Sequence, residues 1–192
     1  MTSNLTGARV LVTGGARGLG LRTAQAILER GGAVVIADIN EEAGAEAVAT
    51  LAAGGHTATF VALDVTDDAS WERASAEAVA ALGGLTGVVN NAGIEISDLF
   101  VDLDPDAMRK ILDVNVVGTA LGIKHAFRAM RPEGAAGSGG AIVNIASVAA
   151  TIAFPGIAAY SASKSAVERL TKVAAAESGR LGYGVRVNTV CP

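Results

Sequence analysis

The sequence predicts an α/β protein with a doubly wound parallel sheet covered by helices on both faces, in three layers (αβα). Short apolar, β-branched runs alternate along the chain with segments whose apolar residues recur at helical spacing. A glycine-rich turn follows the first apolar run directly. No linker interrupts the alternation, so residues 1–192 are expected to form a single domain.

Each predicted strand is a run of Val, Ile, Leu and Ala that ends in glycine or polar residues, a pattern typical of strands buried on both faces. The strands are expected at residues 8–15, 33–39, 57–65, 85–93, 140–147 and 183–190. The segments between them are predicted helices at 18–32, 40–55, 66–84, 104–130 and 158–182, with a loop at 132–140. Asn40 and either Thr66 or Asp67 are expected N-caps, and Pro105 suits a first helical turn.

Composition restricts the possible classes of function. Of the 192 residues 51% are apolar and 18% are charged, which indicates a folded chain, and the net charge of −4 argues against a nucleic-acid surface. A single cysteine, no signal-peptide pattern and no apolar run of about 18–20 residues favour a cytoplasmic protein outside the membrane. His56 and His125 lack clustered partners, so we expect no metal site and no Ser-His-Asp triad, and both histidines are predicted at the surface. Cys191 and Trp71 are predicted packing residues.

The turn "TGGARGLG" is a candidate dinucleotide site. Gly14, Gly18 and Gly20 leave room for the backbone to approach a pyrophosphate at the N-terminus of the following helix, as in Rossmann-type folds. An ordinary glycine-rich turn would look similar, but Asp38 ends the next strand, where a carboxylate can bind ribose hydroxyls and repel the 2′-phosphate of NADP. Ile39 supplies no replacing cation, whereas Arg17 is a contrary sign. The pattern favours NAD over NADP.

"YSASK" places Tyr160 and Lys164 four residues apart, on one face of a predicted helix. Such a pair alone is more often a surface contact. Ser147, however, ends the preceding strand, at the sheet edge where ligands of open α/β sheets bind. An ammonium within about 4–6 Å favours the phenolate, so Tyr160 could act as general acid/base while Ser147 binds the same substrate oxygen.

Taken together, these motifs resemble the short-chain dehydrogenase/reductase family over essentially the whole chain. The shared residues are "TGGARGLG", Asp64–Val65, "NNAG" at 90–93, Asn115, Ser147 and "YSASK", in the family's order and approximate spacing. The resemblance implies that Asp64 and the Val65 backbone meet the adenine, that Asn91 lies near a ribose, and that Asn90 braces the sheet. It also implies that Lys164 binds the nicotinamide ribose and that Asn115 supports a water in the proton path. The full expected cofactor set is Gly14, Arg17, Gly18, Leu19, Gly20, Asp38, Ile39, Asp64, Val65, Asn91, Ala92, Gly93, Tyr160 and Lys164.

The expected function is therefore hydride transfer between NAD and a secondary alcohol or ketone, with Asn115, Ser147, Tyr160 and Lys164 as the catalytic residues. Apolar residues that could line the substrate pocket together with Ser147 are Ile94, Ile96, Phe154 and Ile157. The alternatives are an NADPH-dependent 3-oxoacyl-thioester reductase, which Arg17 favours, a non-catalytic dinucleotide-binding protein, and a nucleotide-sugar epimerase, which also uses a Tyr-x-x-x-Lys pair.

Two further expectations come from the resemblance. Family members continue beyond the strand that ends at "RVNTVCP" with a substrate-covering segment, so the sequence is expected to lack that segment. The long helices that begin at Asp104 and Ala158 pair between subunits in the family, which predicts a homodimer or homotetramer.

Overall fold

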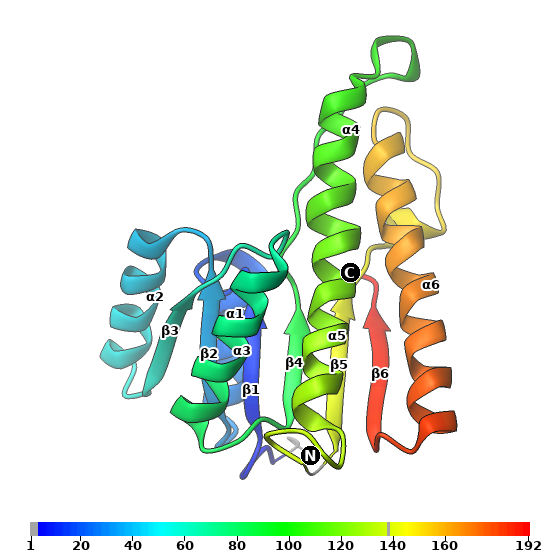
Figure 1. Cartoon of the computed structure of the whole chain (residues 1–192). Coiled ribbons are helices and arrows are strands. Elements are labelled where there is room, and N and C mark those ends of the chain that lie inside the picture. Colours follow the sequence, from blue (N-terminus) through cyan, green and yellow to red (C-terminus); the bar gives the residue numbers. More distant parts are fainter. Residues whose placement is uncertain (1–3, 138) are drawn as a thin grey trace.

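A computed structural model of the chain describes residues 4–137 and 139–192. Its core is one sheet of six parallel strands in the order β3-β2-β1-β4-β5-β6 (Figure 1). The strands are β1 (Arg9–Thr13), β2 (Ala33–Asp38), β3 (Ala58–Ala62), β4 (Gly87–Asn90), β5 (Gly140–Ile145) and β6 (Val185–Val190). The chain order reverses at β1, which lies between β2 and β4, so this is the doubly wound parallel sheet that the sequence predicts.

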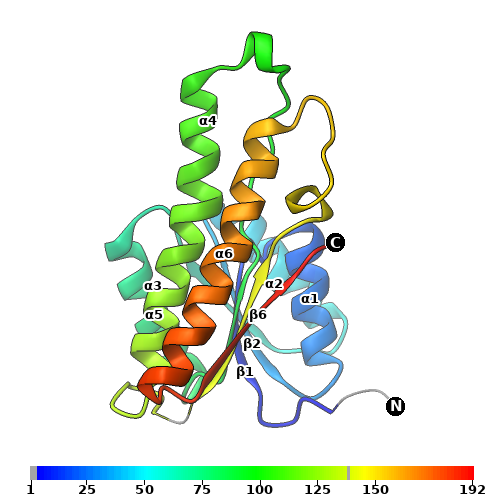
Figure 2. The ribbon, with the colours of Figure 1, turned by 90° about the vertical axis from the view of Figure 1, so that its right-hand side faces the viewer.

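The helices form two layers. They are α1 (Gly18–Leu28), α2 (Glu41–Ala53), α3 (Asp68–Leu82), α4 (Pro105–Leu112), α5 (Gly118–Met130) and α6 (Ala158–Leu181), with short turns η1 (Phe100–Asp102), η2 (Asp113–Val117) and η3 (Val148–Ala150). Seen along the sheet, α1 and α2 cover one face while α3, α5 and α6 cover the other (Figure 2). Successive strand residues face opposite layers: Leu11 packs with the α3–α5–α6 layer, and Val10 and Val12 pack with α1 and α2.

The predicted helix 104–130 is interrupted. Residues Asp113–Val117 form a π-turn between α4 and α5, so the helical segment carries one wide turn around Asn115. Such single wide turns are frequent at functional sites. The segment from α4 to α5 extends well beyond the carboxyl ends of the strands (Figure 1).

Helix starts agree with the predicted caps. Asn40 Oδ1 accepts from the Ala43 backbone N–H at 2.9 Å, and Pro105 occupies the first turn of α4. Of the two candidates for α3, Asp67 is the cap, because its carboxylate accepts from the N–H groups of Ala69 and Ser70.

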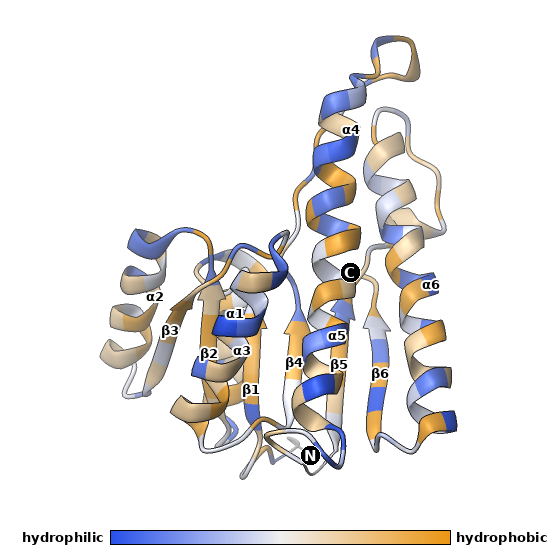
Figure 3. Cartoon of the chain, viewed as in Figure 1, coloured by the Kyte–Doolittle hydropathy of each residue, from blue (hydrophilic) through white to orange (hydrophobic). Residues whose placement is uncertain are grey.

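The strands are mainly apolar, whereas the helices carry both polar and apolar residues (Figure 3). Polar side chains are also buried, among them two amides that join elements. Asn90 Nδ2 donates to Asn144 Oδ1 at 2.8 Å, joining β4 to β5, and Asn144 Nδ2 donates to Thr171 Oγ1 at 2.9 Å, joining β5 to α6. Asn90 therefore does brace the sheet. Within the described residues no helix is long and apolar enough to cross a bilayer.

Two predictions about single residues are wrong. His125 is buried, with 5% of its surface exposed, because it stacks on Trp71 and its Nε2 lies 2.8 Å from an Asp68 oxygen. Cys191 is exposed rather than packed. Trp71 is a core residue, as predicted: it is 1% exposed, and its indole N–H donates to the Val65 carbonyl oxygen at 3.0 Å.

Candidate active site

The turn between β1 and α1 is closed against the end of β4. Gly14 has φ +59°, a conformation that favours glycine, and a Cβ on Gly20 would collide with the carbonyl oxygen of Gly14. Asn91 Nδ2 donates to the carbonyl oxygens of Thr13 and Gly14 at 2.9 and 3.0 Å. At Gly14 and Gly20 the turn can therefore hold only residues without a side chain. Such a turn lets a phosphate group come close to the backbone N–H groups.

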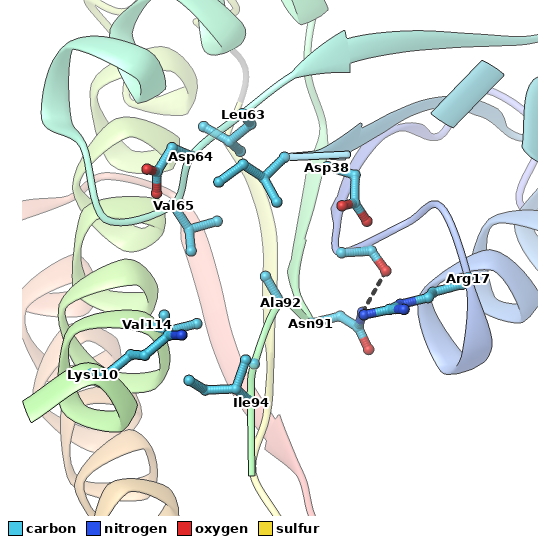
Figure 4. Close-up of a pocket in the computed structure, with 13 residues that line it drawn as sticks. Arg17, Asp38, Leu63, Asp64, Val65, Asn91, Ala92, Ile94, Lys110 and Val114 are labelled. Carbon is cyan, nitrogen blue, oxygen red and sulfur yellow. Dashed lines mark hydrogen bonds between the residues drawn. The ribbon is translucent and has the colours of Figure 1, made fainter. Parts of the chain in front are cut away.

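A cavity of about 450 Å³ opens beside this turn, at the point where the strand order reverses. Its lining residues are Gly14, Arg17, Asp38, Ile39, Leu63, Asp64, Val65, Asn91, Ala92, Gly93, Ile94, Lys110 and Val114. Arg17 and Asp38 lie on one side of it, and Asp64, Lys110 and Val114 on the other (Figure 4). An apolar slot with a glycine turn at its floor and carboxylates at its rim fits a dinucleotide.

Both carboxylates at the rim are held by backbone groups. Asp38 Oδ2 accepts from the Ala16 N–H at 3.2 Å and Oδ1 accepts from the Asn40 N–H at 3.1 Å, so Asp38 ties the glycine turn to the end of β2. Asp64 Oδ1 accepts from the N–H and hydroxyl groups of Thr66. A carboxylate oxygen can accept more than one bond, so either residue can still receive a hydroxyl or amino group of a ligand.

A second cavity, of about 420 Å³, adjoins the first and contains the predicted reacting side chains. Its lining residues are Leu19, Asn91, Gly93, Ile94, Glu95, Ile145, Ala146, Ser147, Tyr160, Lys164 and Pro192. Asn91, Gly93 and Ile94 line both cavities. A ligand long enough to follow these three residues would therefore reach from Asp38 to Tyr160.

Lys164 lies between Tyr160 and the sheet. Its Nζ is 5.6 Å from the centre of the Tyr160 ring and donates to the Ile145 carbonyl oxygen at 2.8 Å. The side chain is 5% exposed, and burial lowers the pKa of its ammonium. Ser147 caps η3 by accepting from the Ala149 N–H at 3.2 Å, which leaves its hydroxyl proton free for a ligand.

Asn115 stands behind these residues rather than in either cavity. Its Oδ1 accepts from the Ile94 N–H at 2.8 Å, and its Nδ2 donates to the Ile94 carbonyl oxygen at 2.9 Å. The π-turn places this amide inward, with 1% of the residue exposed. A Cβ on Gly93 would be 3.2 Å from Asn115 Oδ1 and 3.4 Å from Lys164 Nζ, so the three residues are close neighbours.

The structure separates the predicted substrate-pocket residues. Ile94 lines the second cavity with Ser147, whereas Ile96 lines a different, small cavity under α4. Phe154 is exposed on the loop before α6, and Ile157 pairs with Asp98 in an isolated bridge. Gly18 and Gly20 shape the turn without lining the cavities.

Sequence reasoning missed several lining residues. In the first cavity these are Leu63, Lys110 and Val114. In the second cavity they are Glu95, Ile145, Ala146 and Pro192. Some signals existed: Leu63 precedes Asp64, Val114 precedes Asn115, and Glu95 follows Ile94 directly. Lys110 had none, because its position depends on the path of α4.

Comparisons with known proteins agree with this architecture. The family model described as "short chain dehydrogenase" matches residues 8–192. A 2,5-dichloro-2,5-cyclohexadiene-1,4-diol dehydrogenase of Sphingobium indicum is 43% identical over 192 residues, which are all of this chain and 74% of the relative. An NADP-dependent (R)-specific alcohol dehydrogenase of Lentilactobacillus kefiri is 36% identical, over all of this chain and 75% of that protein.

A solved short-chain dehydrogenase from Mycobacterium smegmatis superposes with a TM-score of 0.92 and 34% identity, covering 98% of this chain and 77% of that one. The chain belongs to the short-chain dehydrogenase/reductase family. It is accordingly a pyridine-nucleotide oxidoreductase that acts on CH–OH groups.

Proposed function

We propose that the protein transfers hydride between NAD(H) and a secondary alcohol or ketone, with Tyr160 as the general acid/base. The observation that carries the proposal is the arrangement of Tyr160, Lys164 and Ser147 in one cavity that adjoins the dinucleotide cavity. Bound NAD would supply the hydride acceptor for alcohol oxidation. The protein's own residues bind the substrate oxygen and move its proton.

In the oxidative direction, the Tyr160 phenolate removes the proton of the substrate hydroxyl as the C–H bond of the carbinol carbon breaks. In the reductive direction, the phenol returns a proton to the carbonyl oxygen. The Ser147 hydroxyl donates to the same oxygen and orients it. The Lys164 Nζ lies 5.6 Å from the centre of the Tyr160 ring, so its charge is close to the group that moves the proton.

The choice of NAD rests on Asp38, whose carboxylate lines the cofactor cavity at the end of β2 and would meet the 2′-phosphate of NADP with like charge. Arg17 lines the same cavity and keeps the second candidate open, an NADPH-dependent 3-oxoacyl-thioester reductase. Separate assays decide between them. We expect NADH formation from NAD⁺ and cyclohexanol or cyclohexane-1,2-diol, and little oxidation of NADPH by an acetoacetyl thioester.

Tyr160→Phe tests the chemistry, because it removes the proton-transfer group and keeps the ring. We expect a loss of kcat of about 100-fold or more, in the range of general acid–base catalysis. Dinucleotide affinity, measured by quenching of Trp71 fluorescence, should change little. Normal turnover by Tyr160→Phe would refute the proposed role.

We also infer a homodimer or homotetramer. Val117 and Val173 are 43% and 48% exposed on the outer side of the η2–α5 and α6 segments, which suits pairing of these helices between copies. Light scattering coupled to size exclusion should give a mass of two or four chains, and a monomer at micromolar concentration would contradict the inference.

A further inference from the structure

The hydroxyl of Ser163 connects three parts of the candidate active site. Ser163 lies on α6 between Tyr160 and Lys164 and is fully buried. Its Oγ donates to the Tyr160 carbonyl oxygen at 2.7 Å and accepts from Asn115 Nδ2 at 3.0 Å. The first bond alone would be an ordinary contact of serine with its own helix. The second reaches another segment of the chain.

These contacts fix the orientation of the Asn115 amide. A serine hydroxyl has one proton, and here that proton goes to the Tyr160 carbonyl, so Oγ can only accept from Asn115. Ser163 therefore acts together with the Ile94 carbonyl oxygen, which also accepts from Nδ2, to hold Nδ2 on this side and Oδ1 toward the Ile94 N–H. Rotating the amide by a half-turn would bring an NH₂ group against the Ile94 N–H and leave that donor unpaired.

We propose that Ser163 is a positioning residue: it locks the Asn115 amide, and through it the Ile94 backbone, to the helical turn that carries Tyr160 and Lys164. The consequence is direct, because Ile94 lines both cavities. The contact of Ser163 with Asn115 follows from the geometry alone, whereas its effect on turnover rests on the proposed function.

Ser161 provides a matched control on the same helix. Its hydroxyl oxygen is also buried, but it has no hydrogen-bond partner among the described residues. Ser161→Ala and Ser163→Ala therefore remove the same atom from the same stretch, and only the second removes the contact with Asn115.

Amide hydrogen exchange tests the lock without any assay of activity. In Ser163→Ala the Asn115 amide loses a partner and the Ile94 N–H should exchange roughly 5- to 100-fold faster, the range expected for one buried hydrogen bond. The N–H of Leu11 in β1 should be unchanged, and Ser161→Ala should resemble the wild type. Unchanged exchange at Ile94 in Ser163→Ala would overturn the proposal.

Kinetics with NAD⁺ and cyclohexanol tests the effect on turnover. Ser163→Ala should lower kcat about tenfold or more and should also weaken dinucleotide binding, because Ile94 lines both cavities. If Ser163 acts through Asn115, the double variant Asn115→Ala/Ser163→Ala should be no slower than Asn115→Ala. A full further loss in the double variant, or an unchanged kcat in Ser163→Ala, would refute the positioning role.

Two outcomes distinguish a failure of the Ser163 proposal from a failure of the proposed function or of folding. A wild-type protein that oxidises none of the alcohols refutes the proposed function, and the exchange experiment then still decides whether the lock exists. If Ser163→Ala does not fold, Ser163→Cys replaces it, because a thiol is nearly isosteric and a weak acceptor. Ile94 exchange in Ser163→Cys should then be faster than in the wild type, and equal exchange would overturn the proposal.

Discussion

Lys164 Nζ donates to the carbonyl oxygen of Ile145, the last residue of β5, over 2.8 Å. Ser147 follows two residues later, so this bond ties the helix that carries Tyr160 to the strand end that carries Ser147. The same ammonium therefore helps to place the two groups that contact the substrate oxygen in the proposed reaction.

The burial of Lys164 predicts a pH-dependent stability. Because burial lowers the pKa of this ammonium below the usual 10.5, the unfolded chain binds more protons between the folded pKa and 10.5. The free energy of unfolding of the wild type should therefore rise with pH relative to Lys164→Met across that window. Urea unfolding from pH 7 to 11 measures it, with the exposed Lys172→Met as reference. A difference that falls with pH would contradict the prediction.

We expect Asp38 to determine the preference between NAD⁺ and NADP⁺. Asp38→Asn removes the negative charge and keeps one oxygen, which can accept from one of the two backbone N–H groups that Asp38 binds, those of Ala16 and Asn40. The ratio of kcat/KM for NAD⁺ over NADP⁺ should fall roughly tenfold or more, because like charge at a binding site costs several kcal/mol. Arg17→Ala should shift the ratio the other way. An Asp38→Asn enzyme with an unchanged ratio would show that Asp38 does not discriminate.

Asp68 makes a contact between α3 and α5 that we expect to be sensitive to acid. Hydrogen bonds from Lys124 and then His125 lower the pKa of this carboxyl from 3.8 to about 2. The stability it contributes is present above pH 3.8 and is lost as pH falls through 2. Asp68→Asn should therefore show a shallower loss of stability between pH 4 and 2 than the wild type. Glu46→Gln, which changes an exposed carboxylate on α2, should run parallel to the wild type.

We expect Glu95 to make the enzyme discriminate between substrates by their charge. It is the acidic side chain in the cavity that contains Ser147 and Tyr160. A neutral alcohol such as cyclohexanol should therefore be oxidised more readily than 4-hydroxycyclohexanecarboxylate. Glu95→Gln should lower KM for the carboxylate several-fold and leave KM for cyclohexanol nearly unchanged. Equal effects on both substrates would show that the charge of Glu95 does not reach the substrate.

The sequence alone predicts the alternation of strands and helices, because buried parallel strands and the glycine turn carry strong local patterns. It also predicts that Asp38, Ser147 and Tyr160 gather at one edge, since the carboxyl ends of parallel strands meet there. Long-range packing is less accessible. The burial of His125 depends on Trp71 and Asp68, which lie on another helix. The residues next to His125 in the sequence give no indication of these contacts.

The finer geometry of the site depends on backbone paths that the sequence does not specify. The π-turn adds one residue to a turn and so redirects Asn115 inward, whereas regular helical spacing predicts one continuous helix. Phe154 lies exposed on the loop before α6 and does not line the cavity that contains Tyr160, although its apolar character predicts a place there.

The position of β1 between β2 and β4 also affects folding. Val10 pairs with Val34 in β2 but with Gly87 in β4, so the second pairing closes a much longer loop and should form later. The cofactor cavity is lined from both sides of this later pairing, because Asp38 ends β2 and Asn91 follows β4. A dinucleotide that contacts both sides would bind only after they have joined, and it should therefore slow unfolding by holding together the pairing that forms last.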